Sequence, residues 1–181
     1  PSEILLSDRE EGLPGTAVAA TMEGVRPLLL EIQALVSPSP YGNPQRSANG
    51  FDHRRMNMIL AVLEKRSGMK MGVNDVFLNV TGGIRVDDPA VDLTVAAALA
   101  SSYHDISIDS KICLAAEVGL SGEIRPINKI EQRIGEADKL GFHTMIISQN
   151  NYKSLARKDF KIKIIPVSRL SDVWKQVFAE H

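Results

Sequence analysis

The stretch from Gly82 to Ser102 constrains the fold more than any other part of this chain. Two glycines and an acidic loop with a proline are followed, from Ala90, by a run of Ala, Leu and Val with helical spacing. This pattern predicts a strand end, a loop and a tightly packed helix over about 90–103. α/β proteins often place reactive groups at such a junction, but Pro89-Ala90-Val91 offers no Ser, Thr or Cys that could act as a nucleophile.

Turn residues and hydrophobic spacing predict the other elements. Two antiparallel strands and a hairpin are expected at the start, and Asp52 is expected to begin an amphipathic helix that ends at Gly68. Residues 37–50 hold too many prolines and glycines for a regular element and are predicted to form a long exposed loop. The expected strands are Thr16–Met22, Pro27–Val36, Asp75–Thr81, Ile112–Val118, Glu123–Pro126, Thr144–Ile147 and Lys161–Val167, and the later helices run from Asn128 or Lys129 to about Leu140 and onward from a cap at Ser168.

This order of elements predicts a mixed α/β fold, with a β-hairpin start and then alternating helices and strands in a partly parallel sheet. Residues 1–15 are interpreted as a leading segment or linker from an upstream domain, and residues 16–181 as one domain. The chain starts with Pro1 rather than Met, which suggests a fragment of a longer protein.

Composition narrows the possible functions. Lys and Arg number 21 against 22 Asp and Glu, so any binding of nucleic acid must come from a local patch of cations. The single cysteine, Cys113, lies in an apolar run and indicates a buried thiol in a reducing, cytoplasmic compartment. No apolar run has the length of a membrane span, and no membrane partner is expected.

Five arginines are candidates for contact with DNA phosphates. Arg54 and Arg55 fall in the first turn of their helix, where the helix dipole disfavours cations, so stability does not explain their position. All five are expected on exposed, turn-like segments without an adjacent carboxylate, which is typical of residues that contact phosphates. The alternative is a scatter of solvated surface charges. The candidate DNA-binding set is Arg26, Arg46, Arg54, Arg55 and Arg85.

Metal chemistry is not predicted. Asp87, Asp88 and Asp92 are three carboxylates in six residues, but further ligand spacing is lacking. Asp88 and Asp92 are instead expected to start the helix and to pair with a neighbour such as Arg133. The four histidines show no ligand spacing, and Trp174 is interpreted as a core residue.

The segment from Glu117 to Ile127 (EVGLSGEIRPI) and the helix expected after it, together with the earlier Pro-Ala, resemble the proteolytic domain of the Lon proteases from about residue 16 onward. That family places its nucleophile in Pro-Ser-Ala-Gly and uses a downstream lysine. Here Ala90 stands at the serine position, Asp92 replaces the glycine and Arg133 falls at the lysine position. Alanine has no hydroxyl and arginine stays protonated, so the resemblance implies a degenerate dyad and a chain that is not an enzyme.

A more detailed resemblance is to the C-terminal Lon-like domain of the RadA family of bacterial DNA-repair proteins. It is carried by Pro1-Ser-Glu and by the segments from Glu23 to Val36, Arg54 to Arg66, Asp88 to Asp92 and Glu117 to Arg125. It implies a hexameric ring, binding of single- and double-stranded DNA, contact with the recombinase RecA and a role in branch migration during homologous recombination. ATP, Mg and Zn are then expected only in upstream domains, because this chain has neither zinc cysteines nor a phosphate-binding glycine loop.

Three alternatives remain at this point. An active Lon-type peptidase would have to use displaced groups such as Lys129, Ser101 or Ser102, none of which is placed to replace the missing pair. A pure oligomerisation module would make no DNA contact. The related domain of magnesium-chelatase-type ATPases shares the Glu-Ile-Arg-Pro segment, but it explains the Arg54-Arg-Met-Asn helix less well.

Overall fold

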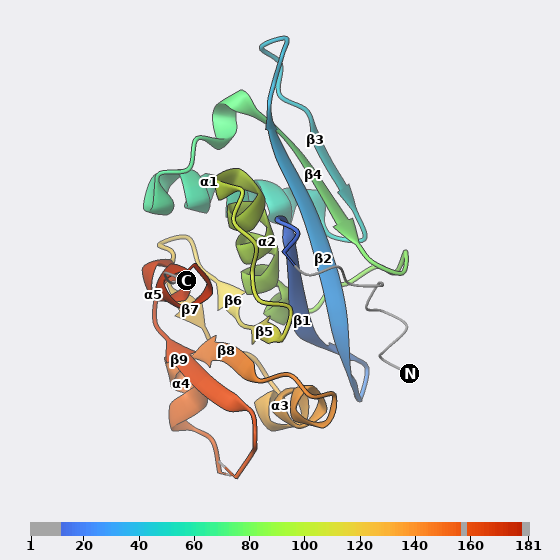
Figure 1. Cartoon of the computed structure of the whole chain (residues 1–181), viewed down its shortest axis with the longest axis vertical. Helices are drawn as coiled ribbons and strands as arrows, with labels where there is room; N and C mark the ends of the chain where they lie inside the picture. Colours follow the sequence, from blue (N-terminus) through green and yellow to red (C-terminus); the bar gives the residue numbers. More distant parts are fainter. Residues whose placement is uncertain (1–11, 157–158, 179–181) are drawn as a thin grey trace.

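A seven-stranded mixed sheet forms the centre of the molecule in the computed structural model, which describes residues 12–156 and 159–178 (Figure 1). Its strand order is β3-β4-β2-β1-β5-β8-β9. Four neighbouring pairs are parallel (β3–β4, β1–β5, β5–β8 and β8–β9), and β1–β2 and β2–β4 are antiparallel. The strands are β1 Thr16–Glu23, β2 Arg26–Pro38, β3 Arg46–Asn49, β4 Asn74–Val80, β5 Ile112–Ala115, β8 Thr144–Ser148 and β9 Lys163–Val167, and a separate hairpin holds β6 Glu117–Val118 and β7 Ile124–Arg125.

Helices cover both faces of this sheet. On β1, Ala17 and Ala19 belong to the larger apolar cluster, which includes α1, α2 and α5, while Val18 and Ala20 belong to the cluster that includes α3. A strand that is buried on both faces has a continuous run of apolar residues, and residues 17–20 of β1 form such a run. The helices are α1 His53–Ser67, α2 Asp92–His104, α3 Ile130–Lys139, α4 Gln149–Lys153 and α5 Leu170–Val177, with single 3₁₀ turns η2 Met71–Val73 and η3 Pro89–Val91. The mixed α/β class and the partly parallel sheet are therefore confirmed.

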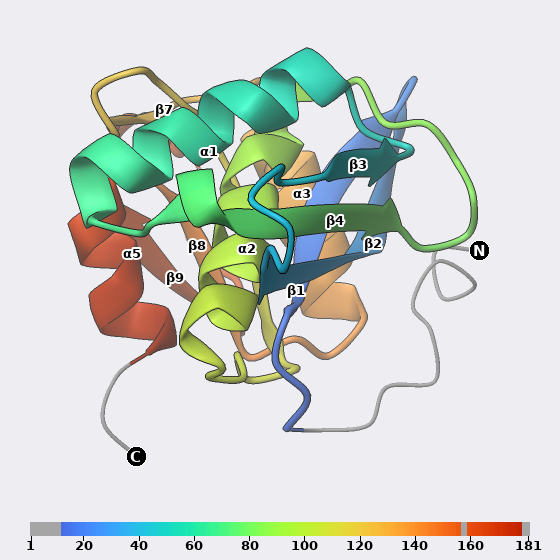
Figure 2. The same ribbon diagram turned by 90° about the horizontal axis from the view of Figure 1, so that it is seen from above.

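Helix α2 lies at the middle of the larger cluster. Every residue from Asp92 to Ser101 is buried, and Ala96, Ala97, Ala98 and Ala100 are fully inaccessible to solvent. Figure 2 shows α1 crossing over it. The small side chains let the sheet and α1 approach the backbone of α2 closely, as the 82–102 stretch predicted.

The C-terminal end of α2 is tied to the sheet by two serines. The backbone N–H of Gly15 donates to Ser101 Oγ at 2.8 Å, and that of Val36 donates to Ser102 Oγ at 2.9 Å. Gly15 has φ +89° and a Cβ there would come within 2.3 Å of the Ala34 carbonyl oxygen, so only glycine fits. Ser101 and Ser102 are thus engaged with backbone and are structural. The predicted leading segment lies largely outside the described residues, which begin at residue 12.

Helix α1 begins and ends as its sequence predicts. Asp52 caps it by accepting the backbone N–H groups of Arg54 and Arg55, and Gly68 ends it with φ +69°. Met56 and Leu63 are fully buried on its inner face. The cap fixes the first turn of α1, and with it the direction of both arginines.

Several predicted boundaries differ from the structure. The predicted loop over 37–50 is wrong in part, because β2 continues to Pro38 and residues 46–49 pair with β4 as an edge strand, where proline can flank a strand without costing a ladder hydrogen bond. The predicted strand Ile112–Val118 splits at Ala116, whose N–H donates to Ala90 O instead. The cap of α5 is Arg169 rather than Ser168, and the short helix α4 was missed.

Trp174 is half-buried and packs against the larger apolar cluster, at the edge of the core. Its ring stacks on Phe178, and its Nε1–H donates to Ser67 Oγ at 3.0 Å. Cys113 is buried, as expected. Across the two described ranges, no helix combines the length and apolar character needed to cross a bilayer.

We predict that Ala97→Leu lowers the free energy of unfolding by roughly 1–3 kcal/mol, because α2 has no space for three further carbon atoms beside β1 and β2. Urea denaturation with linear extrapolation measures the change. Ala61→Leu on the exposed side of α1 is the matched control and should change stability by less than about 0.5 kcal/mol. Equal effects at the two positions would contradict the packing argument.

Candidate functional site

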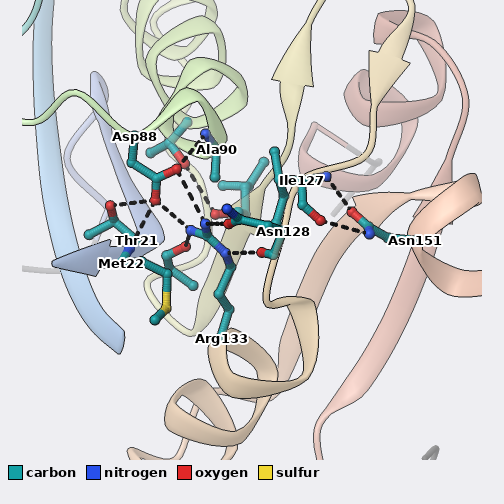
Figure 3. Close-up of polar contacts among 11 residues, drawn as sticks. Thr21, Met22, Asp88, Ala90, Ile127, Asn128, Arg133 and Asn151 are labelled. Carbon is teal, nitrogen blue, oxygen red and sulfur yellow. Dashed lines mark hydrogen bonds and ion pairs between the residues drawn. The ribbon is translucent and has the colours of Figure 1, made fainter. Parts of the chain in front are cut away.

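The loop before α2 and the start of α3 meet at a buried arginine (Figure 3). The Arg133 side chain is 1% exposed, yet all five of its N–H groups have acceptors within the chain. Nε donates to Asn128 O at 2.9 Å and Nη1 to Ala20 O at 2.9 Å. The remaining bonds join Nη1 to Asp88 Oδ2 at 2.6 Å, and Nη2 to Asp88 Oδ1 at 3.2 Å and Asn128 Oδ1 at 3.0 Å. A saturated guanidinium has no donor left for a ligand.

Asp88 is the other half of this site. Besides Arg133, its carboxylate accepts the hydroxyl of Thr21 at 2.8 Å and the backbone N–H groups of Met22 at 2.9 Å and Ala90 at 3.1 Å. Burial acts to raise the pKa of Asp88, but the hydrogen bonds from Arg133 and the backbone outweigh it and hold that pKa below its ordinary value. The predictions that Asp88 starts the helix and pairs with Arg133 are confirmed.

A second clamp holds the segment that leads into α3. The side-chain amide of Asn151 accepts the N–H of Ile127 at 2.9 Å and donates to its carbonyl at 3.0 Å, in the manner of a paired strand. The next residue, Asn128, provides two acceptors to Arg133, and Lys129 takes a left-handed backbone with φ +54°. Sequence reasoning missed Asn151, because its partner lies 24 positions away and no local pattern marks the pair.

Ala90 is fully buried beside this network, and its carbonyl oxygen accepts the N–H of Ala116 at 3.0 Å. Its side chain is a methyl group within the α3-side apolar cluster. The two positions that a Lon peptidase would use therefore hold a packed methyl group and an ion-paired guanidinium. Neither can supply a nucleophile or a base for acyl transfer.

A second buried carboxylate, Asp92, is bound by Arg55 rather than by Arg133. Both Nε and Nη2 of Arg55 contact the Asp92 carboxylate, Nη2 also reaches Glu117 Oε2 at 3.2 Å, and the N–H of Val118 donates to Asp92. Burial raises the pKa of Asp92 in spite of Arg55, while the hydrogen bonds that Arg55 donates to the Asp92 carboxylate raise the pKa of Arg55. The prediction that Arg55 has no adjacent carboxylate is wrong, since it joins α1 to α2 and β6.

The other candidate arginines divide into two groups. Arg46 is half-buried and donates to the carbonyl oxygens of Met71 at 2.8 Å and Asn74 at 2.5 Å. Arg26, Arg54 and Arg85 are exposed, and of these Arg85 contacts Asp87 in an exposed pair at 3.3 Å, which corrects the expectation that it lacks a carboxylate. Exposed pairs of this kind contribute little stability.

The three exposed arginines come from segments on one side of the molecule. Figure 2 shows the start of α1, the β1–β2 turn and the 81–88 loop on the same side. Gly24 and Arg85 line one cavity of about 330 Å³, together with Asp88 and Arg133. Hydrogen bonds from the α1 backbone lower the pKa of Asp52 most, and the charges of Arg85 and Arg54 lower it further. Glu23, Asp52 and Asp87 are exposed on the same segments, so three carboxylates accompany the three arginines.

Metal ligands do not gather at this site. Among the residues that the structure describes, no group of three or more His, Cys, Asp or Glu side chains could hold a metal ion. The expectation that ATP, Mg and Zn are bound outside this chain stays a prediction, as do the binding of DNA and the contact with RecA.

Comparisons with known proteins identify the family. Residues 42–151, more than half of the chain, match the family model described as subunit ChlI of Mg-chelatase. The chain belongs to the ChlI family. The matched region of this ChlI-family chain includes α1, α2, Asp88, Arg133 and Asn151.

Relatives of this ChlI-family chain are DNA-repair proteins. It is 44% identical to the DNA repair protein RadA of Streptococcus pneumoniae over 99% of its length, 45% to that of Bacillus subtilis over 95%, and 51% to that of Listeria monocytogenes over 83%. It spans 42%, 37% and 33% of those three proteins, respectively. The resemblance to RadA is therefore confirmed over most of the chain.

The prediction that this chain is not an enzyme is wrong. The ChlI match and the RadA relatives together point to a DNA-repair protein of an ATPase family. The prediction was based on Ala90 and Arg133 and on the lack of a phosphate-binding glycine loop in the sequence. The loss of a serine–lysine pair excludes one chemistry, acyl transfer, without bearing on any other.

We predict that Arg133→Met costs about 3–5 kcal/mol of unfolding free energy, because it removes the guanidinium and leaves Asp88 partly buried without a counter-ion. Urea denaturation at neutral pH measures this. Arg125→Met, which breaks the exposed pair with Glu123, is the matched control and should cost less than about 1 kcal/mol. A loss at Arg133 no larger than at Arg125 would show that the network is not stabilising.

We also predict a pH dependence that Asp88 carries. Its pKa is lowered in the folded chain, so its stabilising contribution is present above the ordinary aspartate pKa and is lost as the pH falls through the lowered value. Asp88→Asn should therefore be less stable than the parent near neutral pH but should lose less stability between about pH 6 and about pH 3.

Urea titrations at a series of pH values test this prediction. The pKa of Asp92 is raised, so Asp92 changes the stability of the parent with pH in the opposite direction. The test therefore compares the pH dependence of the variant's stability with that of the parent. Asp87→Asn is the control, since Asp87 is exposed and its ion pair with Arg85 is exposed as well. Parallel curves for Asp88→Asn and the parent would contradict the prediction.

Proposed function

We propose that this chain is a ring-forming, DNA-contacting domain of a RadA-type DNA-repair ATPase, with a Lon-like fold, and that it acts in branch migration during homologous recombination. The observation that carries the proposal is the 44% identity to RadA of Streptococcus pneumoniae across 99% of the chain. The domain then works as one part of an ATP-driven enzyme, in a hexamer that encircles or lines DNA and can also contact RecA.

The DNA contact is proposed for Arg26, Arg54 and Arg85. They are exposed and come from three segments on one side of the molecule that Asp52 and Asp88 hold in place. Arg46 and Arg55 contribute less, because their guanidinium groups already bind backbone carbonyls or Asp92. The nearby carboxylates make a single domain a weak binder, so the proposal needs a ring that multiplies the sites.

The alternatives have less support. A serine peptidase lacks both reacting groups, since Ala90 is buried and Arg133 is saturated with acceptors. A pure oligomerisation module would leave the three exposed arginines without a role, and the experiment below separates it from the DNA-contacting domain.

We predict that Arg26→Ala, Arg54→Ala and Arg85→Ala in the full-length protein each lower the slope of log affinity for duplex DNA against log salt by about one unit. Each removes one phosphate contact, so the loss should not depend on DNA sequence. Fluorescence anisotropy at several salt concentrations measures the slope, and sedimentation checks the ring in each variant. Lys175→Ala on α5 is the control. Unchanged slopes in intact rings would favour the oligomerisation module.

A further inference from the structure

A second surface lies away from Arg133, where α1 faces β3 and η2. It is a groove of about 670 Å³, with Leu60 and Met71 beneath it and Ala61 and Gly72 on its walls. A Cβ on Gly72 would meet only Glu64 Oε1, at 3.7 Å. Small side chains on both walls therefore leave room for an extended segment of another chain.

Arg46 is anchored at one side of this groove. Its Nη1 donates to the carbonyl oxygens of Asn74 and Gln45, and Nη2 donates to that of Met71. These bonds leave Nε–H and one Nη2–H without an acceptor among the described residues. The same two nitrogens of Arg55 bind the Asp92 carboxylate in this molecule. The groove thus presents a fixed guanidinium edge of the kind that binds a carboxylate through two bonds.

The other charges around the groove favour an anionic partner. Glu64 is the one carboxylate on its lining, and Oε1 of Glu64 already accepts the backbone N–H groups of Met71 and Gly72, both at 2.9 Å. Lys65 lines the groove and Lys70 precedes Met71; both are exposed, and neither has an ion pair within the ranges that the structure describes. Cations therefore exceed anions here, although the whole chain is close to neutral.

Two exposed apolar side chains lie on the segments beside the groove. Val73 in η2 is 64% exposed, and Tyr41 in the 39–45 loop is 88% exposed. The loop is fixed at both ends against the wall of the groove, because Ser39 N–H donates to Val73 O at 3.0 Å and Gln45 N–H donates to Asp75 Oδ1 at 2.7 Å. An aromatic ring held out on a short anchored loop is typical of a contact residue in a protein interface.

We propose that this groove is a docking site for an extended acidic peptide of a partner protein, with one carboxylate on Arg46, others near Lys65 and Lys70, and apolar side chains against Tyr41 and Val73. A peptide fits better than nucleic acid, because the Glu64 carboxylate on the lining would repel a continuous phosphate backbone but can lie between the spaced carboxylates of a peptide. The docking site is independent of the DNA contact proposed above, since it uses none of Arg26, Arg54 or Arg85.

The test measures the binding of a fluorescein-labelled peptide of repeating Asp-Leu-Asp-Phe to this chain by fluorescence anisotropy. A peptide with Asn for each Asp and an oligothymidylate of the same length are the comparison ligands. Arg46→Lys, which keeps the charge but loses the two-bond edge, should weaken binding of the acidic peptide about tenfold. Lys65→Glu should weaken it several-fold and is the variant that does not touch a backbone contact.

Lys175→Glu on α5 is the matched control and should bind like the parent, and urea denaturation shows that each variant is folded. Binding of the acidic peptide that is lost in Lys65→Glu but kept in Lys175→Glu supports the docking site. Equal binding of the Asn peptide, tighter binding of oligothymidylate, no binding by the parent, or equal loss in the two charge reversals would each overturn it.

Discussion

The rest of the structure depends on the burial of one guanidinium. Removing an arginine from water costs several kcal/mol unless every donor finds an acceptor, and Arg133 finds five, on β1, on Asp88 and on Asn128. The acceptors come from three separate segments, so none of these can shift without exposing an unsatisfied charge. Because arginine does not deprotonate, the guanidinium keeps its charge and all five donors at any pH at which the chain is folded, and only the Asp88 side of the pair titrates.

This restraint also separates the arginines of the chain by role. Arg133 and Arg55 face inward and are bound by Asp88 and Asp92, the two carboxylates that flank the start of α2. Arg85 lies on the loop that Asp88 ends and faces outward. The inner pairs thus fix the loop whose outer residues remain available to a partner. Closeness in the sequence does not predict burial here, since Asp87 is exposed and its neighbour Asp88 is mostly buried.

The order of the elements could be predicted because each depends on local chemistry. Asp52 and Gly68 mark the ends of α1 through capping, and the glycine at the first hairpin and the Ala-rich run of α2 are equally local signals. What could not be predicted depends on tertiary contact. Residues 46–49 form a strand because they pair with β4. Arg55 forms an internal ion pair with Asp92 because α1 crosses α2, and the side chain of Asn151 bonds to the distant backbone of Ile127. The pairing of Asp88 with Arg133 is the exception, because it is a predicted contact between residues 45 positions apart.

The composition of α2 bears on how this chain can change over time. Ten successive residues, from Asp92 to Ser101, have no side that faces water, and half of them are Ala or Ser. On an ordinary amphipathic helix about half of the positions accept new side chains freely, whereas here nearly every replacement must be accommodated by β1, β2 or α1 as well. Variation among descendants of this sequence should therefore collect in the outer loops and on α1, while the central helix drifts slowly and in step with the strands beside it.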